Sequence, residues 1–257
     1  MRYEIEMDAD RHSICAYRTT EQVTLGILLR VFGTIPCRHG VLPSCQEDAL
    51  RIVAAELQAC IDSLLASTSA DDLLFCSTAI SDTLLFCHNR ILALQQFLGE
   101  GIYLGGVVFA GNDHGDYVSQ HFGAAASYHV ANGQLKLKSR LPQTGLKRLI
   151  VDAMGCRNYE NAWNWSPQVV RGHLAAGETL IFSSTVFPDL EQIKEKIKPA
   201  LASDKRKSEN TTAMVLRRIL RRSPTAVLII RCDSDTETND IQSSESLMTE
   251  VNPNDAE

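Results

Sequence analysis

The sequence has no apolar run of the roughly 18–20 residues that a helix needs to cross a bilayer. Its first twelve residues, MRYEIEMDADRH, contain no apolar stretch of the kind that forms a signal peptide. The eight cysteines include no Cys-x-x-Cys pair, and their spacings are irregular. We therefore expect neither a membrane span nor a disulfide scaffold, and a cytoplasmic, reducing location.

Basic residues are absent from the last part of the chain. Residues 233–257 hold eight acidic side chains and no Lys or Arg, which leaves a net charge of +2 on residues 1–232 against −6 for the whole chain. Binding to nucleic acid would need a basic stripe on the body of the protein, so we expect no nucleic acid partner. The acidic tail has no aromatic residues and is expected to be disordered. The domain prediction is therefore one body, residues 1–232, followed by a tail, residues 233–257.

Apolar residues make up 44% of the chain, enough for a core, and their spacing changes several times along it. Helical spacing appears over residues 47–65, after a Ser44-x-x-Glu47 capping box, and over residues 74–98. Hairpin-like strands and a second pair of helices follow, which together predict an α+β protein. The other predicted strands are residues 2–7, 23–33, 102–110, 117–122, 125–130, 134–138, 168–173, 179–183 and 225–231, and the other predicted helices are residues 190–202 and 212–222.

Three segments carry small residues and glycines in a particular order. They are GAAASYHVANGQL at residues 123–135, LAAGETLIFSSTV at residues 174–186 with Ala-Met-Gly upstream at 153–155, and SPTAVLII at residues 223–230. They resemble the Gly-Asp-Ser-Arg-x-Tyr, Leu-x-x-Gly-Asp-x-Leu-Leu-Leu-x-Ser-Asp-Gly and closing Asp-Asn-x-Thr motifs of the metal-dependent protein phosphatases, the PPM or protein phosphatase 2C family. The resemblance covers residues 1–232. It implies a four-layer αββα sandwich of two antiparallel sheets flanked by helix pairs.

The family hydrolyses phosphoesters with two divalent ions that share an activated water, and such ions need carboxylate oxygens. The resemblance places Phe32, Ala124, Thr185 and Arg222 where the family has metal-ligating aspartates or their neighbours. Asp10 is the one weak relic of a ligand. The glycine and apolar framework therefore persists while the carboxylates are lost.

This pattern predicts a pseudophosphatase: a phosphatase-like domain, similar in its short length to bacterial members, that acts in protein binding or regulation of phospho-signalling. No catalytic residue and no cofactor is expected, and the expected partner is a protein such as a phosphoprotein or a kinase, with no membrane partner. The alternative is a divergent, active serine/threonine phosphatase that holds Mn²⁺ or Mg²⁺ with Asp8, Asp10, Asp152 or Glu178. A third possibility is an α+β domain unrelated to the family.

The segment from residue 194 to residue 222 is the one basic stretch, with ten Lys or Arg against three acids. Arg217, Arg218, Arg221 and Arg222 share one face of the last predicted helix. They are the partner-binding candidates, because guanidinium groups bind phosphate through two hydrogen bonds at once. A solvated outer face, or a surface covered by the acidic tail, are the alternatives.

Overall fold

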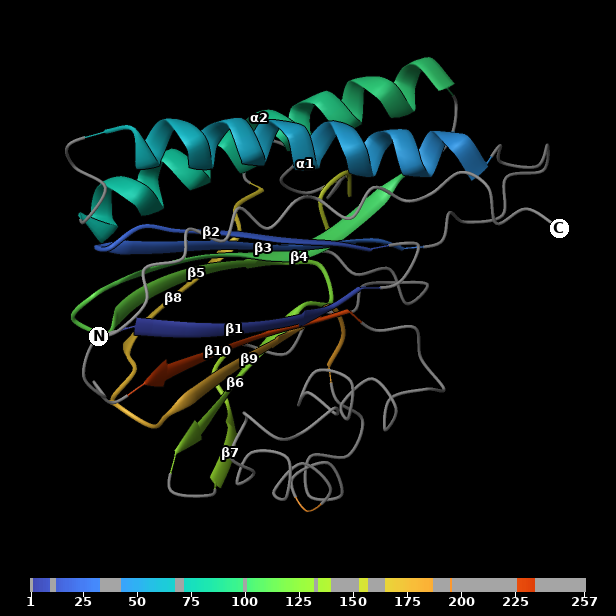
Figure 1. Cartoon of the computed structure of the whole chain (residues 1–257). Helices are drawn as coiled ribbons and strands as arrows, with labels where there is room; N and C mark the ends of the chain where they lie inside the picture. Colours follow the sequence, from blue (N-terminus) through green and yellow to red (C-terminus); the bar gives the residue numbers. More distant parts are fainter. Residues whose placement is uncertain are drawn as a thin grey trace, which may run out of the picture.

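Two antiparallel sheets lie face to face, and a pair of long helices covers the outer face of one of them (Figure 1). The computed structural model describes residues 2–9, 13–32, 43–67, 72–98, 101–131, 134–139, 153–156, 165–186, 195 and 226–233. These residues confirm the predicted α+β sandwich of two sheets. The predicted helices at 190–202 and 212–222, residue 195 aside, and residues 234–257 of the tail lie outside the described residues.

The sheet beneath the helices, here the helix-side sheet, has five strands, all antiparallel to their neighbours. The strand order is β2-β3-β4-β5-β8, in which each of the first three strands pairs with the next along the chain and β5 pairs with β8. Their bounds are β2 Ser13–Thr19, β3 Val23–Phe32, β4 Tyr103–Asn112, β5 Asp116–Phe122 and β8 Gln168–His173.

The second sheet also has five antiparallel strands, in the order β1-β10-β9-β6-β7. Its first two members come from opposite ends of the described chain: Arg2 lies opposite Asp233, and Asp8 lies opposite Val227. The bounds are β1 Arg2–Asp8, β10 Val227–Asp233, β9 Thr179–Ser183, β6 Ala126–Ala131 and β7 Gln134–Leu137.

The helical layer consists of α1, Pro43–Leu65, and α2, Leu73–Leu98. The predicted capping box is wrong, because α1 begins before Ser44, with Pro43 in the first turn, where its fixed φ angle is favourable. For α2, the Asp72 carboxylate accepts hydrogen bonds from the backbone N–H groups of Leu74 (2.8 Å) and Phe75 (3.2 Å) and so caps the helix. Neither helix is long and apolar enough to cross a membrane, among the residues that could be searched.

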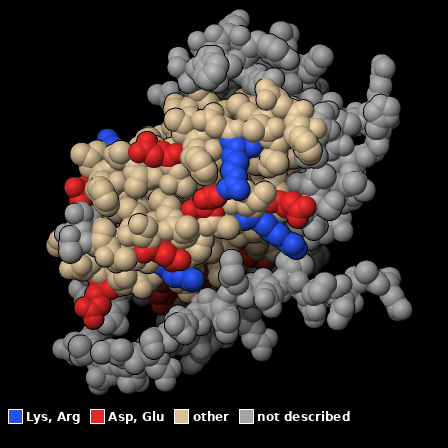
Figure 2. Space-filling model, turned by 90° about the horizontal axis from the view of Figure 1, so that it is seen from above, with Lys and Arg blue, Asp and Glu red and all other residues tan. Residues whose placement is uncertain are grey.

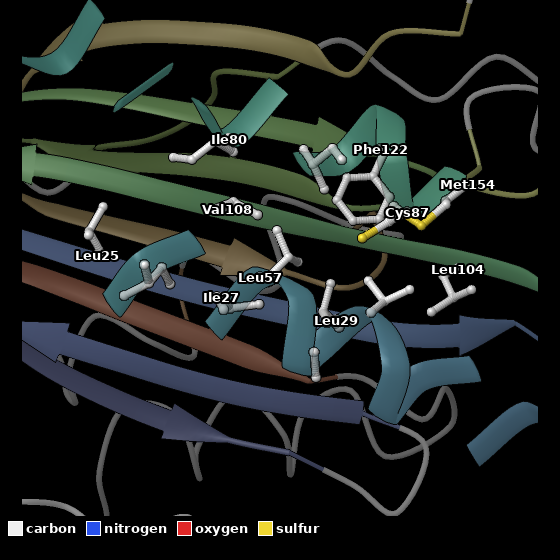
Figure 3. Packing of buried hydrophobic residues seen from close by; sticks show 14 of the residues in the cluster. Leu25, Ile27, Leu29, Leu57, Ile80, Cys87, Leu104, Val108, Phe122 and Met154 are labelled. Carbon is white, nitrogen blue, oxygen red and sulfur yellow. The ribbon is translucent and has the colours of Figure 1, made fainter. Parts of the chain in front are cut away.

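The core between the helices and the helix-side sheet follows from alternation along the strands. Leu25, Ile27 and Leu29 of β3 point toward the helices, where they meet Leu57 of α1 and Ile80 of α2 (Figure 3). These side chains are almost completely buried. The amphipathic helices are therefore held on the sheet by apolar burial, at about 1.5–3 kcal/mol for each large side chain.

A second core fills the space between the two sheets and is rich in aromatic rings. Phe109 of β4 is fully buried there and contacts Phe182 of β9 (5.5 Å between ring centroids), Tyr3 of β1 (6.1 Å) and Tyr117 of β5 (6.0 Å). Because Phe182 and Tyr3 belong to the second sheet, Phe109 connects the two layers. Burial also raises the pKa of Tyr117, with Glu178 adding to the shift.

The sequence predicts two strands in the first 35 residues, and the structure has three. Strand β2 was missed, and β2 and β3 form a hairpin in which Ser13 lies opposite Arg30 and Thr19 opposite Thr24. The turn has no Gly, Pro or Asn; instead, the Thr20 hydroxyl accepts from the N–H of Val23 at 3.1 Å. This Thr-based turn is the physical reason for the error, since such turns are weaker sequence signals.

Hydrogen bonds to α2 and β4 hold residues 153–156 in place, and Gly155 makes two of them. Met154 forms an isolated bridge with Leu104, and Gly155 (φ +83°) donates its N–H to Nδ1 of His88 at 3.2 Å. The Gly155 carbonyl accepts from the Gln95 side chain at 2.9 Å. A methyl group at Gly155 would lie 2.3 Å from the carbonyl oxygen of Ile102.

A Gly155→Ala substitution is expected to lower the free energy of unfolding by about 2–4 kcal/mol. Alanine is strained in the left-handed backbone conformation at this position, and its methyl group would clash with the Ile102 carbonyl. Urea unfolding followed by circular dichroism measures the loss. Gly177→Ala is the matched control, because its φ is also +81° but nothing lies within 4 Å of the added methyl. Equal losses in the two variants would contradict the close packing at Gly155.

Candidate functional site

The predicted site positions gather at one end of the sandwich. In the second sheet, Asp8 lies opposite Val227, Val227 opposite Ser183, and Ser183 opposite Ala126. The end of β1, the end of β9 and the start of β6 therefore lie at the same end of this sheet. Phe32 ends β3 in the helix-side sheet. The structure therefore brings the backbone at positions 8, 124 and 185 to one end of the second sheet, whereas Asp10, Arg222 and the side chain of Phe32 lie outside the described residues.

The turn after β9 is fixed by its own hydroxyl groups. Ser184 donates its N–H to the Ala226 carbonyl (3.0 Å), and the Ser184 hydroxyl accepts from the N–H of Ala226 (3.0 Å). The Ser183 hydroxyl donates to the Thr185 carbonyl at 2.7 Å. This segment, which resembles Ser-Asp-Gly, is thus held to the start of β10 and presents the neutral Thr185 where the family has an aspartate.

The start of β6 is apolar at the same end. Gly123 has a φ of +69°, a conformation that favours glycine and turns the chain from β5 toward β6. The next three residues, Ala124, Ala125 and Ala126, are all buried. Their methyl groups stand where the resembled motif has Asp-Ser-Arg, so this turn keeps the backbone of the motif and offers no side-chain oxygen.

A buried cation lies between the sheets at this end. Arg30 of β3 is 7% exposed and, like Leu28 two residues earlier, faces the second sheet. Its guanidinium Nη1 donates to the Ser184 hydroxyl at 3.4 Å, which links the helix-side sheet to the end of β9. Arg30 is not among the predicted site residues, although a lone arginine inside the apolar run VTLGILLRVF is a visible signal.

The described residues at this end do not fit a centre for two divalent ions. Mg²⁺ and Mn²⁺ need several oxygen ligands, mainly carboxylates. Ala124 supplies none, and Thr185 supplies only an uncharged hydroxyl group. Within the described part of the chain, no three His, Cys, Asp or Glu side chains are grouped closely enough to hold a metal ion.

The alternative metal ligands are Asp8, Asp10, Asp152 and Glu178. The structure describes two of them, Asp8 and Glu178, and these two do not lie together. Glu178 precedes β9, whose first residue lies level with Arg231 and Glu4, whereas Asp8 lies level with the last residue of β9. That separation along the strands is about 16 Å. Asp10 and Asp152 lie outside the described residues.

Glu178 has a local role at its own end of the sheet. Its carboxylate accepts from the Ala175 N–H at 3.0 Å and lies 2.9 Å from Nε2 of His129. Partial burial alone would raise the pKa of Glu178, but these two hydrogen bonds and the nearby rings of His129 and His173 lower it overall. Glu178 is therefore an anion fixed within the fold.

Two buried histidines were also absent from the predicted site. His121 lies three residues before Ala124, faces the space between the sheets and shares a 2.9 Å hydrogen bond with the Ser119 hydroxyl; burial lowers its pKa to about 3. His88 of α2 stacks on Trp165 (4.5 Å between ring centroids), and burial lowers its pKa to about 4. Both rings are neutral at pH 7.

The four arginines proposed to bind a partner, Arg217, Arg218, Arg221 and Arg222, lie outside the described residues. The structure therefore leaves them as a prediction.

No protein-family model and no curated protein sequence matches the chain. Solved structures do match over most of its length. The serine/threonine phosphatase of S. agalactiae has a TM-score of 0.65 at 15% identity and covers 90% of this chain and 100% of its own. The Mycobacterium tuberculosis serine/threonine phosphatase PstP/Ppp has a TM-score of 0.57 at 16% identity, with coverages of 91% and 99%.

The PP2C phosphatase domain of SpoIIE from Bacillus subtilis, with a fragment of its regulatory domain, matches with a TM-score of 0.56 at 12% identity; the match covers 91% of this chain and 64% of that one. At such identities the likeness concerns the fold, and it confirms the PP2C-like sandwich predicted from the sequence. The described part of the chain is thus phosphatase-like in architecture.

Proposed function

We propose that this chain is a pseudophosphatase: a PP2C-like domain that binds a protein partner in phospho-signalling and does not hydrolyse phosphoesters. The proposed partner is a phosphoprotein or a kinase. The fold supports the family-level part of this proposal, and the residues at the end of the sandwich support the loss of catalysis.

The observation that carries the proposal is the buried guanidinium of Arg30. It lies beside Ser184, one residue before Thr185, so a fixed positive charge occupies the end of the sandwich where the resembled family gathers carboxylates around cations. A cation cannot share that space with two divalent ions unless several carboxylates compensate it. Ala124 and Thr185 offer a methyl and a hydroxyl group at this end, where Asp8 of β1 also lies.

The proposed mode of action follows from what this end still supplies. Arg30 and the turn of Ser184 fasten the two sheets to each other, so the sandwich keeps its shape without a bridging ion. A rigid phosphatase-like surface of this kind suits recognition of a phosphatase substrate or regulator without turnover. We also propose a cytoplasmic location, which is supported by the finding that the described cysteines form no disulfide.

The test is a titration of Mn²⁺ into the full chain by isothermal calorimetry, with p-nitrophenyl phosphate turnover measured on the same preparation. We expect no binding at millimolar Mn²⁺, a Kd weaker than about 1 mM, and no turnover above that of the buffer. The S. agalactiae phosphatase, prepared in the same way, is the positive control. Circular dichroism of the titrated sample shows that a negative result comes from a folded protein.

Stoichiometric Mn²⁺ binding with turnover would overturn the proposal in favour of a divergent, active phosphatase. In that case Asp10 and Asp152 are the first residues to substitute, because Asp8 and Glu178 lie at opposite ends of the second sheet. Binding without turnover would also contradict it, since the domain would then hold a metal that we expect it to lack.

A further inference from the structure

The outer face of α2 carries a line of exposed aromatic side chains. Phe75, Phe86 and Phe97 are 44%, 54% and 88% exposed. Consecutive members are eleven residues apart, close to three helical turns, so the three rings follow one line along the helix. Three exposed phenylalanine rings on one line of one helix offer contact points for another apolar helix face.

The residues between these rings repeat in mirror order about Phe86. Ala79 and Ala93 lie seven residues before and after it, and Asp82 and Arg90 lie four residues before and after it. All of them fall within about 40° of Phe86 around the helix axis. We call Phe75, Ala79, Asp82, Phe86, Arg90, Ala93 and Phe97 the α2 stripe.

Mirror order of this kind makes the stripe complementary to itself about a two-fold axis. When two copies of a helix run antiparallel about an axis beside Phe86, each residue before Phe86 comes level with the residue equally far after it in the other copy. Phe75 then comes level with Phe97 of the second copy, and Ala79 with Ala93. The small alanines leave room for the helices to approach between the rings.

The charges agree with this arrangement. Asp82 and Arg90 are the only Asp, Glu, Lys or Arg residues between Leu73 and Leu98, and the two-fold axis brings each level with the opposite charge of the other copy. Arg90 is already held at the edge of the stripe, because it pairs with Glu56 of α1 and lies over the Phe86 ring at 5.9 Å. Figure 2, which looks onto the helices, shows the visible part of this face as mostly uncharged, with acidic and basic groups side by side near its middle.

We propose that the α2 stripe is a homodimer interface in which two copies of α2 pack antiparallel about a two-fold axis at Phe86. The occupant is a second copy of this chain, because its own stripe supplies both the matching rings and the opposite charges. The inference rests on α2 alone and is independent of whether the domain is a phosphatase.

The first test is sedimentation equilibrium of the full chain at about 1–100 μM, the range in which interfaces of modest size associate. We expect a monomer–dimer equilibrium, and we expect Phe86→Glu to weaken the dimer by about 100-fold or more, because the change removes both central rings and brings two carboxylates together at the axis. Leu74→Glu is the matched control: Leu74 is 64% exposed on the same helix, outside the stripe, and its variant should dimerise like the parent.

The second test uses the charge pair. Asp82→Arg and Arg90→Glu should each weaken their own homodimer, because like charges then come level. An equimolar mixture of the two variants should form a heterodimer, since both cross-pairs again have opposite signs. Circular dichroism of each variant shows whether it is folded.

The two tests have clear contrary outcomes. A wild-type chain that stays monomeric over the whole range would overturn the proposal and leave a helix of an unlike protein as the occupant of the stripe. Dimers that survive Phe86→Glu, or that are lost equally with Leu74→Glu, would place the interface elsewhere. Failure of the mixed variants to associate more strongly than either alone would reject the two-fold register about Phe86.

Discussion

Phe109→Ala is expected to destabilise the protein by about 3–5 kcal/mol, a large part of the stability of an ordinary domain. The ring is fully buried between the sheets and touches Phe182 and Tyr3 of the second sheet as well as Tyr117 beside it. Its removal leaves a cavity at the point where the layers meet, and close-packed β-sheets cannot collapse readily to fill it. Three aromatic contacts are lost with it.

The measurement is urea unfolding of Phe109→Ala, Phe109→Leu and Leu74→Ala beside the parent protein. Phe109→Leu keeps much of the volume and should cost about 1–2 kcal/mol. Leu74→Ala removes an exposed side chain of α2 and should change the free energy of unfolding by no more than about 0.5 kcal/mol. A cost for Phe109→Ala as small as that of Leu74→Ala would mean that the two sheets do not pack through this ring.

Lowering the pH from about 6.5 toward 4 is expected to destabilise the protein, at pH values above those at which most carboxylates take up a proton. Burial lowers the pKa of His121 to about 3 and that of His88 to about 4, whereas both rings take up a proton near pH 6.5 once the chain is unfolded. Between pH 6.5 and about 4 the unfolded chain therefore binds more protons than the folded one. The stability that is present above pH 6.5 is lost as the pH falls, by up to about 3 kcal/mol for each histidine.

The free energy of unfolding should be measured in urea at several pH values between 7 and 4. Each of His121→Gln and His88→Gln should reduce the slope of stability against pH in this window, by up to about 1.4 kcal/mol per pH unit. His114→Gln is the control, because the His114 side chain is 80% exposed. If all three variants keep the slope of the parent, the buried histidines are not the source of the acid sensitivity.

The sequence predicted helices and strands well where local residue patterns mark the ends of these elements. Strands β8 and β9 match their predicted ranges, and α2 differs by one residue at its start, because an acidic cap and a change of periodicity mark these limits. Strand β2 was missed since its turn is built on threonine hydroxyls. Strand β4 extends two residues past its prediction because Asn112 takes part in the ladder before the turn closes.

The sequence indicated which positions belong to the candidate site, but it did not predict the buried positive charge of Arg30 there. The family resemblance implied that positions near residues 10, 32, 124 and 185 lie together. The structure shows only that the strand ends next to residues 10, 124 and 185 are level in the second sheet. The contact of Arg30 with Ser184 could not be predicted, because it depends on how two sheets from distant parts of the chain face each other. The same is true of Glu178, whose distance from Asp8 follows from strand register alone.

The pairing of β1 with β10 has a consequence for how the protein is made. Strands β2 to β5 and both helices are contiguous in the chain, so the helix-side half can assemble from contacts that are mostly near in sequence while synthesis continues. Strand β1 leaves the ribosome before the other described strands, but its partner β10 is complete only after residue 233 has been added. Such a high contact order makes closure of the second sheet a late and slow step. The aromatic face of the helix-side sheet is therefore expected to stay uncovered until the second sheet closes, and such exposed apolar surface favours aggregation of the folding chain.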